Sequence, residues 1–469
     1  MVVGDITTGT EMLVIGGGPG GYTAAIRAGQ LDVDVTLVEA EAYGGTCLNH
    51  GCIPSKAFVH ATDVAHEAGG AERMGVHADP AVDAAAMTDW KDGIVDRLTG
   101  GVEKLCKANG VELIEGRAEF VDETTARIVH GGDGQGSESI EFETAVVATG
   151  SRPVEIPPVP FDGDRIMSSR AALDIESTPE SLLVVGGGYI GMELSSVFGK
   201  LGTDVTVIEA LDDILPAYGP DVTRVVRKRA EELGVSFALE EPATGCETTD
   251  ESVTITTEDG KYTAERALVA VGREAVTDTV GLEAVGLEPN ADGVIETDEQ
   301  TRTAVENIYA VGDVAGDPML AHKAYVEGHV AAETIAGHSV ALDQQAIPAA
   351  VFTDPEIGSV GLSEAEAEAE GFDPVVGEMP LRASGRALTL DDTDGFVRIV
   401  ADSETEFVLG GRIVGPEAAE LIAEIGLAIE MGARLEDITA TVHVHPTLSE
   451  AIAEAAANAR GEAIHTLNR

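Results

Sequence analysis

The chain has 469 residues and carries 83 acidic but only 29 basic side chains, which gives a formal net charge of −54. A surface this negative repels nucleic acid and anionic membranes, so proteins that bind either through their bulk surface are excluded. The acidic residues are spread along the chain, which favours a salt-adapted globular protein from a halophile over a disordered acidic tail. With 44% hydrophobic residues the chain can bury large cores, and three domains are expected.

The sequence has no segment typical of a signal peptide and no apolar run of the roughly 18 residues that a membrane span requires. We therefore expect a cytoplasmic protein. The four cysteines are Cys47, Cys52, Cys106 and Cys246. In a cytoplasmic chain this number argues for catalytic or incidental thiols and against a disulfide scaffold. Cys106 and Cys246 have no paired spacing and are interpreted as incidental.

A dinucleotide-binding pattern opens the chain. A strand predicted at 11–15 runs into a glycine-rich turn, and an alanine-rich helix leads to a second strand that ends at Glu39. In such a βαβ unit Gly16 makes the tight turn, Gly18 lets the backbone approach a pyrophosphate, and Gly21 lets helix and strand pack closely. Glu39 is positioned to accept hydrogen bonds from an adenosine ribose.

The same unit recurs further along. The interval between the first glycines, at 16 and 186, equals the interval between the two acids, at 39 and 209. A chance match of that register is improbable, so two dinucleotide sites are predicted. The second site has these residues: Gly186, Gly188, Gly191 and Glu209.

An apolar strand ending in glycine follows each unit. The first closes on Thr149 and Gly150, and the second closes on Gly272. The carboxyl ends of such strands lie where a dinucleotide passes, although an ordinary strand-to-turn junction remains the alternative for either one alone. The glycine-rich segment 131–136 is expected to be a loop. Clustered prolines after 152 and the patterns that follow predict three domains: 1–152 together with 276–346, then 153–275, then 347–469.

The chain is organised around residues 44–56, Gly-Gly-Thr-Cys-Leu-Asn-His-Gly-Cys-Ile-Pro-Ser-Lys. In a regular helix, residues five apart have Cα atoms roughly 8.7 Å apart, whereas a disulfide requires about 4.4–6.8 Å. If Cys47 and Cys52 are bridged, the helix must begin with a distorted turn, which Gly51 suits. Lys56 lies one turn after Cys52, and its charge together with the helix N-terminus favours a thiolate. From spacing alone, a structural disulfide or two inert thiols remain open.

Residues 44–56 resemble the redox-active segment of the pyridine nucleotide–disulfide oxidoreductases, and they are most similar to the members that oxidise dihydrolipoamide. The resemblance extends over nearly the whole chain through at least six ordered motifs. It implies an α/β fold with two Rossmann-like domains, which bind FAD and NAD, and a C-terminal α+β dimerisation domain. It also implies a homodimer that acts on free dihydrolipoamide or on a lipoylated protein of the 2-oxoacid dehydrogenase or glycine cleavage type.

The resemblance assigns the reacting groups. Cys47 and Cys52 form the redox disulfide, and His445, polarised by Glu450, is the active-site base that faces the disulfide of the partner subunit. Two histidines before a proline can also cap a helix, but the position at the end of the last domain favours the base. Cys52 is expected to become the thiolate that lies against the flavin.

The resemblance also assigns cofactor contacts. The carboxylate of Asp313 bonds the ribityl chain of FAD, although a helix cap is the alternative for this residue alone, and the backbone at Ala321 meets the flavin ring. Lys56 lies near the flavin and pairs with Glu193. Ala118 stands where the family usually has a glycine, and a backbone contact to the adenine would survive that change.

Other members of the family fit less well. A glutathione-reductase-like member would place basic residues near the end of the second unit to bind the 2′-phosphate of NADP, where this chain has Glu209. A mercuric-reductase-like member carries a cysteine pair near its C-terminus, which this chain lacks. A non-catalytic flavin-binding subunit would not be expected to keep Cys47, Cys52 and His445. An acidic cation-binding protein would explain the charge but none of the motifs.

Overall fold

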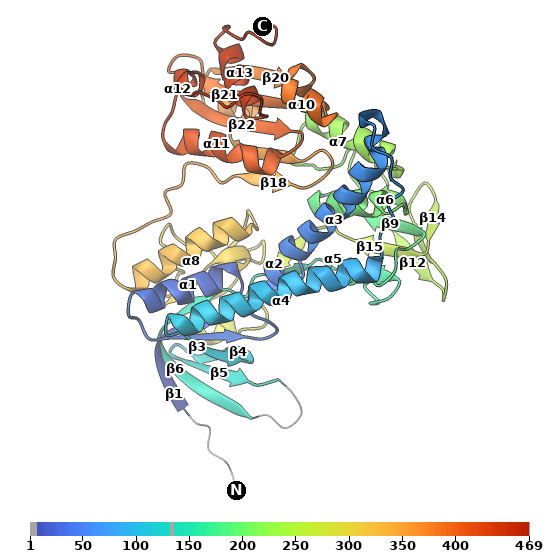
Figure 1. Cartoon of the computed structure of the whole chain (residues 1–469). Helices are drawn as coiled ribbons and strands as arrows, with labels where there is room; N and C mark the ends of the chain where they lie inside the picture. Colours follow the sequence, from blue (N-terminus) through green and yellow to red (C-terminus); the bar gives the residue numbers. More distant parts are fainter. Residues whose placement is uncertain (1–6, 132–135, 469) are drawn as a thin grey trace.

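The computed structural model describes residues 7–131 and 136–468, which form three units, each built around its own sheet (Figure 1). The predicted limits at 152, 275 and 346 lie at connections between these sheets, and the division into domains stays a prediction. Among the described residues, no helix combines the length and the apolar character needed to cross a membrane.

The first unit has a seven-stranded sheet in the order β3-β2-β1-β6-β5-β4, and β17 also pairs with β6. The nucleotide-binding part is parallel, because β1 lies between β2 and β6 and runs in their direction. The predicted loop at 131–136 connects β5 and β6, and its residues 132–135 lie outside the described residues. The strands are β1 (Thr7–Ile15), β2 (Val35–Glu39), β3 (Glu112–Glu115), β4 (Arg117–Asp122), β5 (Thr125–Val129), β6 (Ser137–Val147) and β17 (Ile308–Ala310). The first strand is therefore longer than the predicted 11–15.

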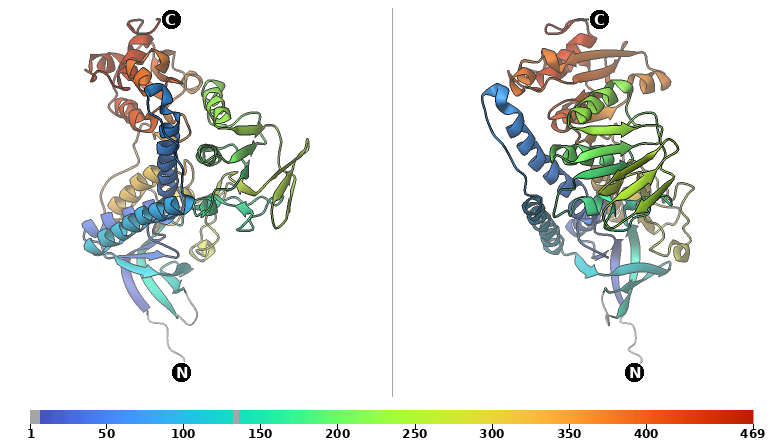
Figure 2. Two further views of the ribbon diagram at one scale, coloured as in Figure 1. Left: turned by 45° about the vertical axis from the view of Figure 1, so that its right-hand side comes forward. Right: turned by 90° about the vertical axis from the view of Figure 1, so that its right-hand side faces the viewer.

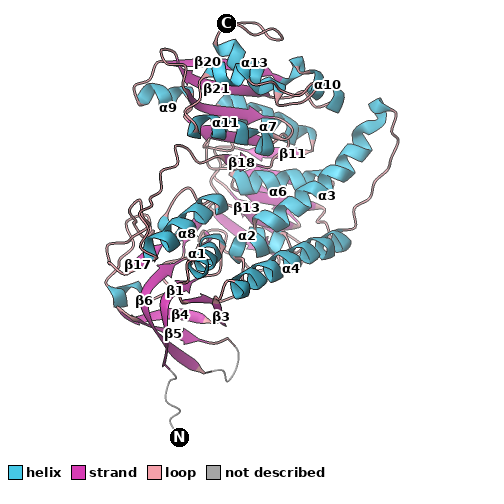
Figure 3. Ribbon diagram, turned by 60° about the vertical axis from the view of Figure 1, so that its left-hand side comes forward, coloured by secondary structure: helices cyan, strands magenta, loops and turns pink. Residues whose placement is uncertain are grey.

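Helices α1 and α8 pack side by side on this sheet (Figure 1). Their contact is close because a Cβ on Gly328 would lie 2.3 Å from the carbonyl oxygen of Gly20. Helices α3 and α4 form a long pair that projects from the sheet (Figures 2 and 3). The helices are α1 (Pro19–Gln30), α2 (Gly45–Asn49), α3 (Cys52–Gly70), η1 (Ala71–Met74), α4 (Ala84–Ala108), η3 (Gly312–Ala315) and α8 (Ala321–Ile335).

The second unit repeats the parallel arrangement in a five-stranded sheet of order β11-β10-β9-β15-β8. The antiparallel ribbon of β7 (Ser151–Pro153) and β16 (Arg273–Ala275) joins it to the first unit. An antiparallel meander, β12-β13-β14, accompanies the parallel sheet. The remaining elements are β8 (Ile166–Met167), α5 (Ser169–Ala172), β9 (Ser181–Val185), α6 (Tyr189–Lys200), β10 (Asp204–Ile208), α7 (Pro220–Glu232), β11 (Val235–Ala238), β12 (Gly245–Thr248), β13 (Val253–Thr256), β14 (Lys261–Ala264) and β15 (Arg266–Val269). The short helix η2 (Leu282–Val285) that follows packs against β4 in the core of the first unit.

The C-terminal unit is an antiparallel sheet of order β18-β19-β22-β21-β20, with α11 and α13 packed on it. Ser363 and Glu366 form a capping box at the start of α9, since each side chain accepts a hydrogen bond from the other residue's backbone N–H. The elements are β18 (Ala349–Val351), β19 (Ile357–Gly361), α9 (Glu364–Ala369), β20 (Pro374–Pro380), η4 (Leu381–Ala383), α10 (Gly385–Leu390), β21 (Phe396–Asp402), β22 (Val408–Val414), α11 (Ala418–Glu430), α12 (Leu435–Ala440) and α13 (Glu450–Ala459).

One hydrophobic core joins all three units. Phe58 of α3, Met192 of α6 and Val351 of β18 are buried in the same cluster. Because a core of this kind is close-packed, it holds the three units in one arrangement around the segment that begins with the two cysteines.

Candidate active site

The turn after β1 and the turn after β9 both require glycine. Gly16 has φ +107°, and a Cβ there would lie 2.2 Å from the carbonyl oxygen of Ala148. Gly186 has φ +106°, and its Cβ would lie 2.5 Å from the carbonyl oxygen of Ala270. Positive φ and contact with the neighbouring strand both exclude a side chain, which accounts for the first glycine of each predicted fingerprint.

The second and third glycines of each fingerprint differ in the space around them. A Cβ on Gly21 would lie 1.8 Å from the carbonyl oxygen of Gly16, and a Cβ on Gly191 would lie 2.0 Å from that of Gly186, so the third glycine brings helix and strand together. Gly188 instead faces open space. No side chain caps α1 or α6, so the backbone amides of their first turns stay available to an anion.

Glu39 and Glu209 make matching contacts. One carboxylate oxygen of Glu39 accepts from Gly17 N at 2.6 Å, and one of Glu209 accepts from Gly187 N, also at 2.6 Å. The other carboxylate oxygen of each acid accepts from a backbone N–H two residues later, that of Glu41 for Glu39 and that of Leu211 for Glu209. The turn thus holds each acid beside the glycine-rich loop, with lone pairs left for a ribose hydroxyl.

The cysteine pair spans a break between two helices. Cys47 lies in α2 and Cys52 is the first residue of α3, while Gly51 between them has φ −136° and ψ −112°. A Cβ on Gly51 would lie 3.0 Å from the carbonyl oxygen of Thr46, so glycine allows this close turn. The predicted distortion at the start of the helix is therefore present, and both cysteines are free thiols here.

The protein shifts the pKa values of the two thiols in opposite directions. A hydrogen bond from the Cys47 thiol lowers the pKa of Cys52 to about 7, and the Lys56 ammonium lowers it further, against the raising effect of desolvation by the surrounding protein. The same hydrogen bond, together with burial, raises the pKa of Cys47. The pair thus keeps the proton on Cys47 and the negative charge on Cys52.

Lys56 is held by an acid from the second unit. Its Nζ lies 2.7 Å from Glu193 Oε2, and the Glu193 side chain is only 5% exposed. Lys56 projects from α3 and Glu193 from α6, which are packed together. This contact is the pairing expected from the resemblance.

Asp313 belongs to a hydrogen-bond chain that the sequence did not reveal. Ser151 Oγ donates to Asp313 Oδ2, and Arg273 Nε donates to Ser151 Oγ at 2.7 Å. Arg273 also donates to the backbone carbonyl of Ser151 at 2.6 Å. Ser151 and Arg273 lie on the two strands of the connecting ribbon, whose long separation in sequence hides their contact.

A buried glutamate supports the loop that carries Asp313. Glu327 Oε2 accepts from Gly312 N at 2.7 Å, and Lys323 lies 2.7 Å from its other oxygen. Burial raises the pKa of Glu327, against the lowering effect of Lys323. Glu327 lies fifteen residues after Gly312, and this separation does not allow the contact to be predicted from the sequence.

The other residues expected to touch a cofactor lie on backbone edges. Ala118 is buried in β4, opposite Ile128. Ala321 is the first residue of α8, whose N-terminus has no side-chain cap. Three further residues follow the ends of β6 and β15: Thr149, Gly150 and Gly272.

His445 lies far along the chain in the C-terminal unit. Its Nδ1 is 2.9 Å from Glu450 Oε1, and Thr447 N donates to the other oxygen of Glu450. This backbone donor and then His445 lower the pKa of Glu450. The His445 side chain is 81% exposed, and within the described ranges no hydrogen bond joins it to the cysteine pair of its own chain.

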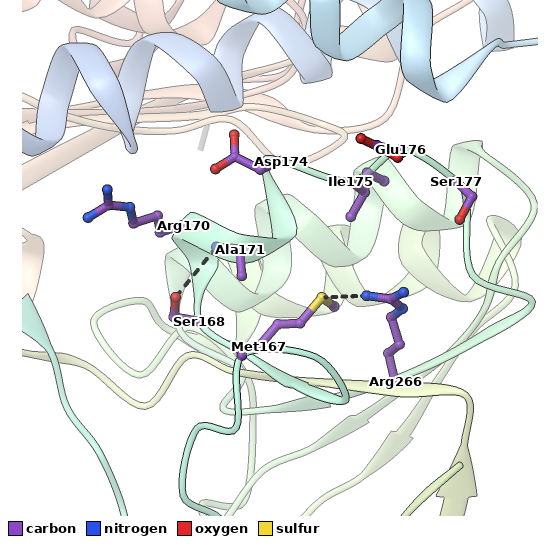
Figure 4. Close-up of a pocket in the computed structure, with 10 residues that line it drawn as sticks. Met167, Ser168, Arg170, Ala171, Asp174, Ile175, Glu176, Ser177 and Arg266 are labelled. Carbon is purple, nitrogen blue, oxygen red and sulfur yellow. Dashed lines mark hydrogen bonds between the residues drawn. The ribbon is translucent and has the colours of Figure 1, made fainter. Parts of the chain in front are cut away.

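A pocket beside α5 has polar walls but no reactive group (Figure 4). Arg266 Nη1 contacts Met167 Sδ, and Ser168 caps α5 by accepting from Ala171 N. Arg170 pairs with Glu41 at 3.0 Å. These polar side chains are engaged in the protein's own contacts. The candidate active site is therefore the one at Cys47 and Cys52, which carries reactive thiols.

The paired nucleotide-binding units, the cysteine pair and the C-terminal sheet define a class, and comparison with known families agrees. Residues 10–328 match the pyridine nucleotide-disulphide oxidoreductase family and residues 347–456 match its dimerisation domain. The chain belongs to the pyridine nucleotide-disulphide oxidoreductase family. The predicted fold, oxidoreductase class and FAD and NAD cofactors are thereby confirmed.

Relatives of known name cover the whole chain. Dihydrolipoyl dehydrogenase 2 of Haloarcula marismortui is 66% identical over 99% of this chain and 100% of its own. Dihydrolipoyl dehydrogenase of Halobacterium salinarum is 65% identical over 100% of both chains. The crystal structure of LpdA from Mycobacterium tuberculosis superposes with a TM-score of 0.89 at 31% identity, covering 95% of this chain and 99% of that one. The first two relatives come from halophiles, in agreement with the acidic composition.

The residues present fit both cofactors. The uncapped start of α1 and the bare backbone at Gly18 would suit a phosphate, and the carboxylate of Glu39 would suit a ribose hydroxyl. Asp313 and the start of α8 lie beyond the strand ends of the same sheet. The second unit offers the same set at α6, with Glu209 in the place of Glu39.

Proposed function

We propose that this chain, as a homodimer, oxidises protein-bound dihydrolipoamide to lipoamide through Cys47 and Cys52 and reduces NAD to NADH. The names of the two halophile relatives, which match the full chain, support the substrate. The free thiols of Cys47 in α2 and Cys52 at the start of α3, together with the His445–Glu450 pair, supply the reacting groups.

The observation that carries the proposal is the unequal proton affinity of the two cysteines. In thiol–disulfide exchange, the sulfur that leaves most readily is the one whose thiol has the lower pKa. The pKa of Cys52 is lowered to about 7 and that of Cys47 is raised. A substrate thiolate therefore attacks Cys47 in the oxidised enzyme and expels Cys52, in the direction expected from the resemblance.

The steps balance as two successive exchanges. One substrate thiol, deprotonated by His445 of the partner subunit, attacks Cys47, and the electron pair of the Cys47–Cys52 bond moves to Cys52. The second substrate thiol then attacks the substrate sulfur of the mixed disulfide. Its proton passes to the departing Cys47 sulfur, which leaves as a thiol, and the lipoamide disulfide is released. An imidazole suits this role because it accepts and returns protons near neutral pH. Glu450, at 2.9 Å, orients the ring.

Bound FAD supplies the two-electron chemistry that connects the cysteine pair with the nicotinamide. Lys56 holds positive charge beside the Cys52 thiolate, and Glu193 fixes Lys56. Glu209 selects the nicotinamide cofactor, because a carboxylate there bonds a ribose hydroxyl and repels the extra phosphate of NADP.

The homodimer is supported by the dimerisation-domain match and by exposed apolar side chains beside the base. Val442 and Val444 are 94% and 72% exposed in the single chain. A second copy of the chain would bury such residues. We place the enzyme in the cytoplasm, where a lipoylated 2-oxoacid dehydrogenase or glycine cleavage protein would supply the dihydrolipoyl group.

The test compares substrates on the purified holoenzyme. We expect NADH formation with dihydrolipoamide and none with glutathione, and no NADPH consumption with Hg(II). Cys47→Ser and Cys52→Ser should each abolish NADH formation, whereas Cys246→Ser, which alters a thiol of β12, should not. Turnover with glutathione or Hg(II) in place of dihydrolipoamide, or activity in the Cys52→Ser variant, would overturn the proposal.

A further inference from the structure

The carboxylate of Glu193 is a junction of the three units. One oxygen lies 2.7 Å from Lys56 Nζ of α3, and the other accepts from the backbone N–H of Phe352 at 2.9 Å. Phe352 directly follows β18, the first strand of the C-terminal unit. Because Glu193 is buried, each of these donors offsets part of the cost of keeping its charge away from water.

The side chain of Phe352 makes a second contact to the same lysine. Lys56 Nζ lies over the ring of Phe352, 4.4 Å from its centroid. A cation at this distance from an aromatic face is attracted by the ring quadrupole. The ammonium is thus held between the Glu193 carboxylate and the Phe352 ring.

We propose that Phe352 is a positioning residue for Lys56, so that the dimerisation domain of each chain helps to build the redox site of that same chain. This inference rests on the proposed role of Cys52 as the thiolate of the cysteine pair. It adds to the role of the same domain in presenting His445 to the partner subunit.

The packing around the contact supports this role. Val351, next to Phe352, is buried in the core that also contains Phe58 of α3 and Met192 of α6. The ring and the amide of Phe352 therefore move together with that core. A displacement of the C-terminal unit would remove the ring from Lys56 and the donor from Glu193 at the same time.

The position of Lys56 affects how readily the Cys52 thiol ionises. The Cys47 thiol and the Lys56 ammonium favour ionisation of the Cys52 thiol, and the Glu193 carboxylate opposes it. The phenols of Tyr189 and Tyr325 also interact electrostatically with this thiol. When the ring is absent, Lys56 loses one of its two fixed partners and its charge is less well placed beside Cys52. Ionisation of Cys52 should then require a higher pH.

The experiment titrates Cys52 in the FAD-bound dimer. In a Cys47→Ser background Cys52 is the remaining thiol of the pair, and its thiolate is followed by its long-wavelength absorption against the flavin as pH rises. Adding Phe352→Leu, which keeps the amide donor, should raise the midpoint by about half a pH unit, which corresponds to roughly threefold less thiolate below it. Phe352→Met is a second variant without a ring and should act in the same direction.

Two variants serve as controls. Phe352→Tyr keeps the ring and should leave the midpoint where it is in the Cys47→Ser parent. Phe407→Leu removes another aromatic ring of the C-terminal unit, which lies 4.9 Å from Arg434 and does not contact Lys56, and it should also leave the midpoint unchanged.

The outcomes separate the two proposals. If the parent shows no thiolate absorption at any pH, the role of Cys52 in the proposed function is wrong. If the parent titrates and both ringless variants bind FAD with the parent's midpoint, the role of Phe352 is wrong. A shift in Phe407→Leu equal to that in Phe352→Leu would likewise overturn it, because the effect would not depend on the Lys56 contact.

Discussion

Removal of the Lys56 ammonium should suppress the thiolate at Cys52. Lys56 follows Cys52 by four residues on α3, so the two side chains share a face of the helix at about 6 Å. A unit charge at that distance, with an effective dielectric constant of about 20, contributes roughly 2.8 kcal/mol, which is about 2 pKa units. The Cys52 midpoint should therefore be about 2 pH units higher in Lys56→Met than in the parent that keeps Lys56.

The assay is the same pH titration of the FAD-bound Cys47→Ser protein, with and without Lys56→Met. The substitution also leaves the buried Glu193 without its cation, so Lys56→Met/Glu193→Gln is included to remove that carboxylate. This double variant should still titrate above the parent, because no cation remains beside the thiol.

Two further variants define the result. Lys56→Arg keeps the charge and should titrate near the parent, and Lys107→Met removes an exposed lysine paired with Glu103 and should change nothing. An unchanged Cys52 midpoint in Lys56→Met, with FAD still bound, would refute the electrostatic reasoning.

The remaining predictions concern the cofactor, the solvent and the dimer. Kinetics with both nicotinamides should favour NAD, because Glu209 repels a 2′-phosphate, and comparable efficiency with NADP would remove Glu209 from this role. Dialysis from molar to 0.1 M salt lengthens the Debye length from ~3 to ~10 Å. Because the net charge of −54 is then less screened, self-repulsion should lower activity and FAD retention. Full stability in dilute buffer would contradict the halophile interpretation. Co-expressed His445→Gln and Cys52→Ser chains should form a heterodimer in which one of the two sites has both an intact histidine and an intact cysteine pair. Roughly half of the native activity should then return. An inactive heterodimer that still binds FAD would exclude a site shared between subunits.

The sequence determined the features that depend on short stretches of backbone. The glycine turns at Gly16 and Gly186 could be predicted because positive φ and strand contact exclude a Cβ at these positions whatever surrounds them. A distorted start of α3 was predicted on the condition that Cys47 and Cys52 are bridged, and the break at Gly51 is present with both thiols free. The pairing of Lys56 with Glu193 required the family resemblance as well, since 137 residues separate them.

Other parts of the site were decided only by tertiary structure. The link from Arg273 through Ser151 to Asp313 forms where two strands of the connecting ribbon pair, and the ring of Phe352 reaches Lys56 because a shared core packs β18 against α3 and α6. Strand β20 has prolines at both ends and no alternating pattern, and it is defined by its pairing with β21. Backbone geometry is local and leaves a signature in residue type and spacing, whereas side-chain contacts between distant segments depend on how whole units pack, which no short pattern in the chain records.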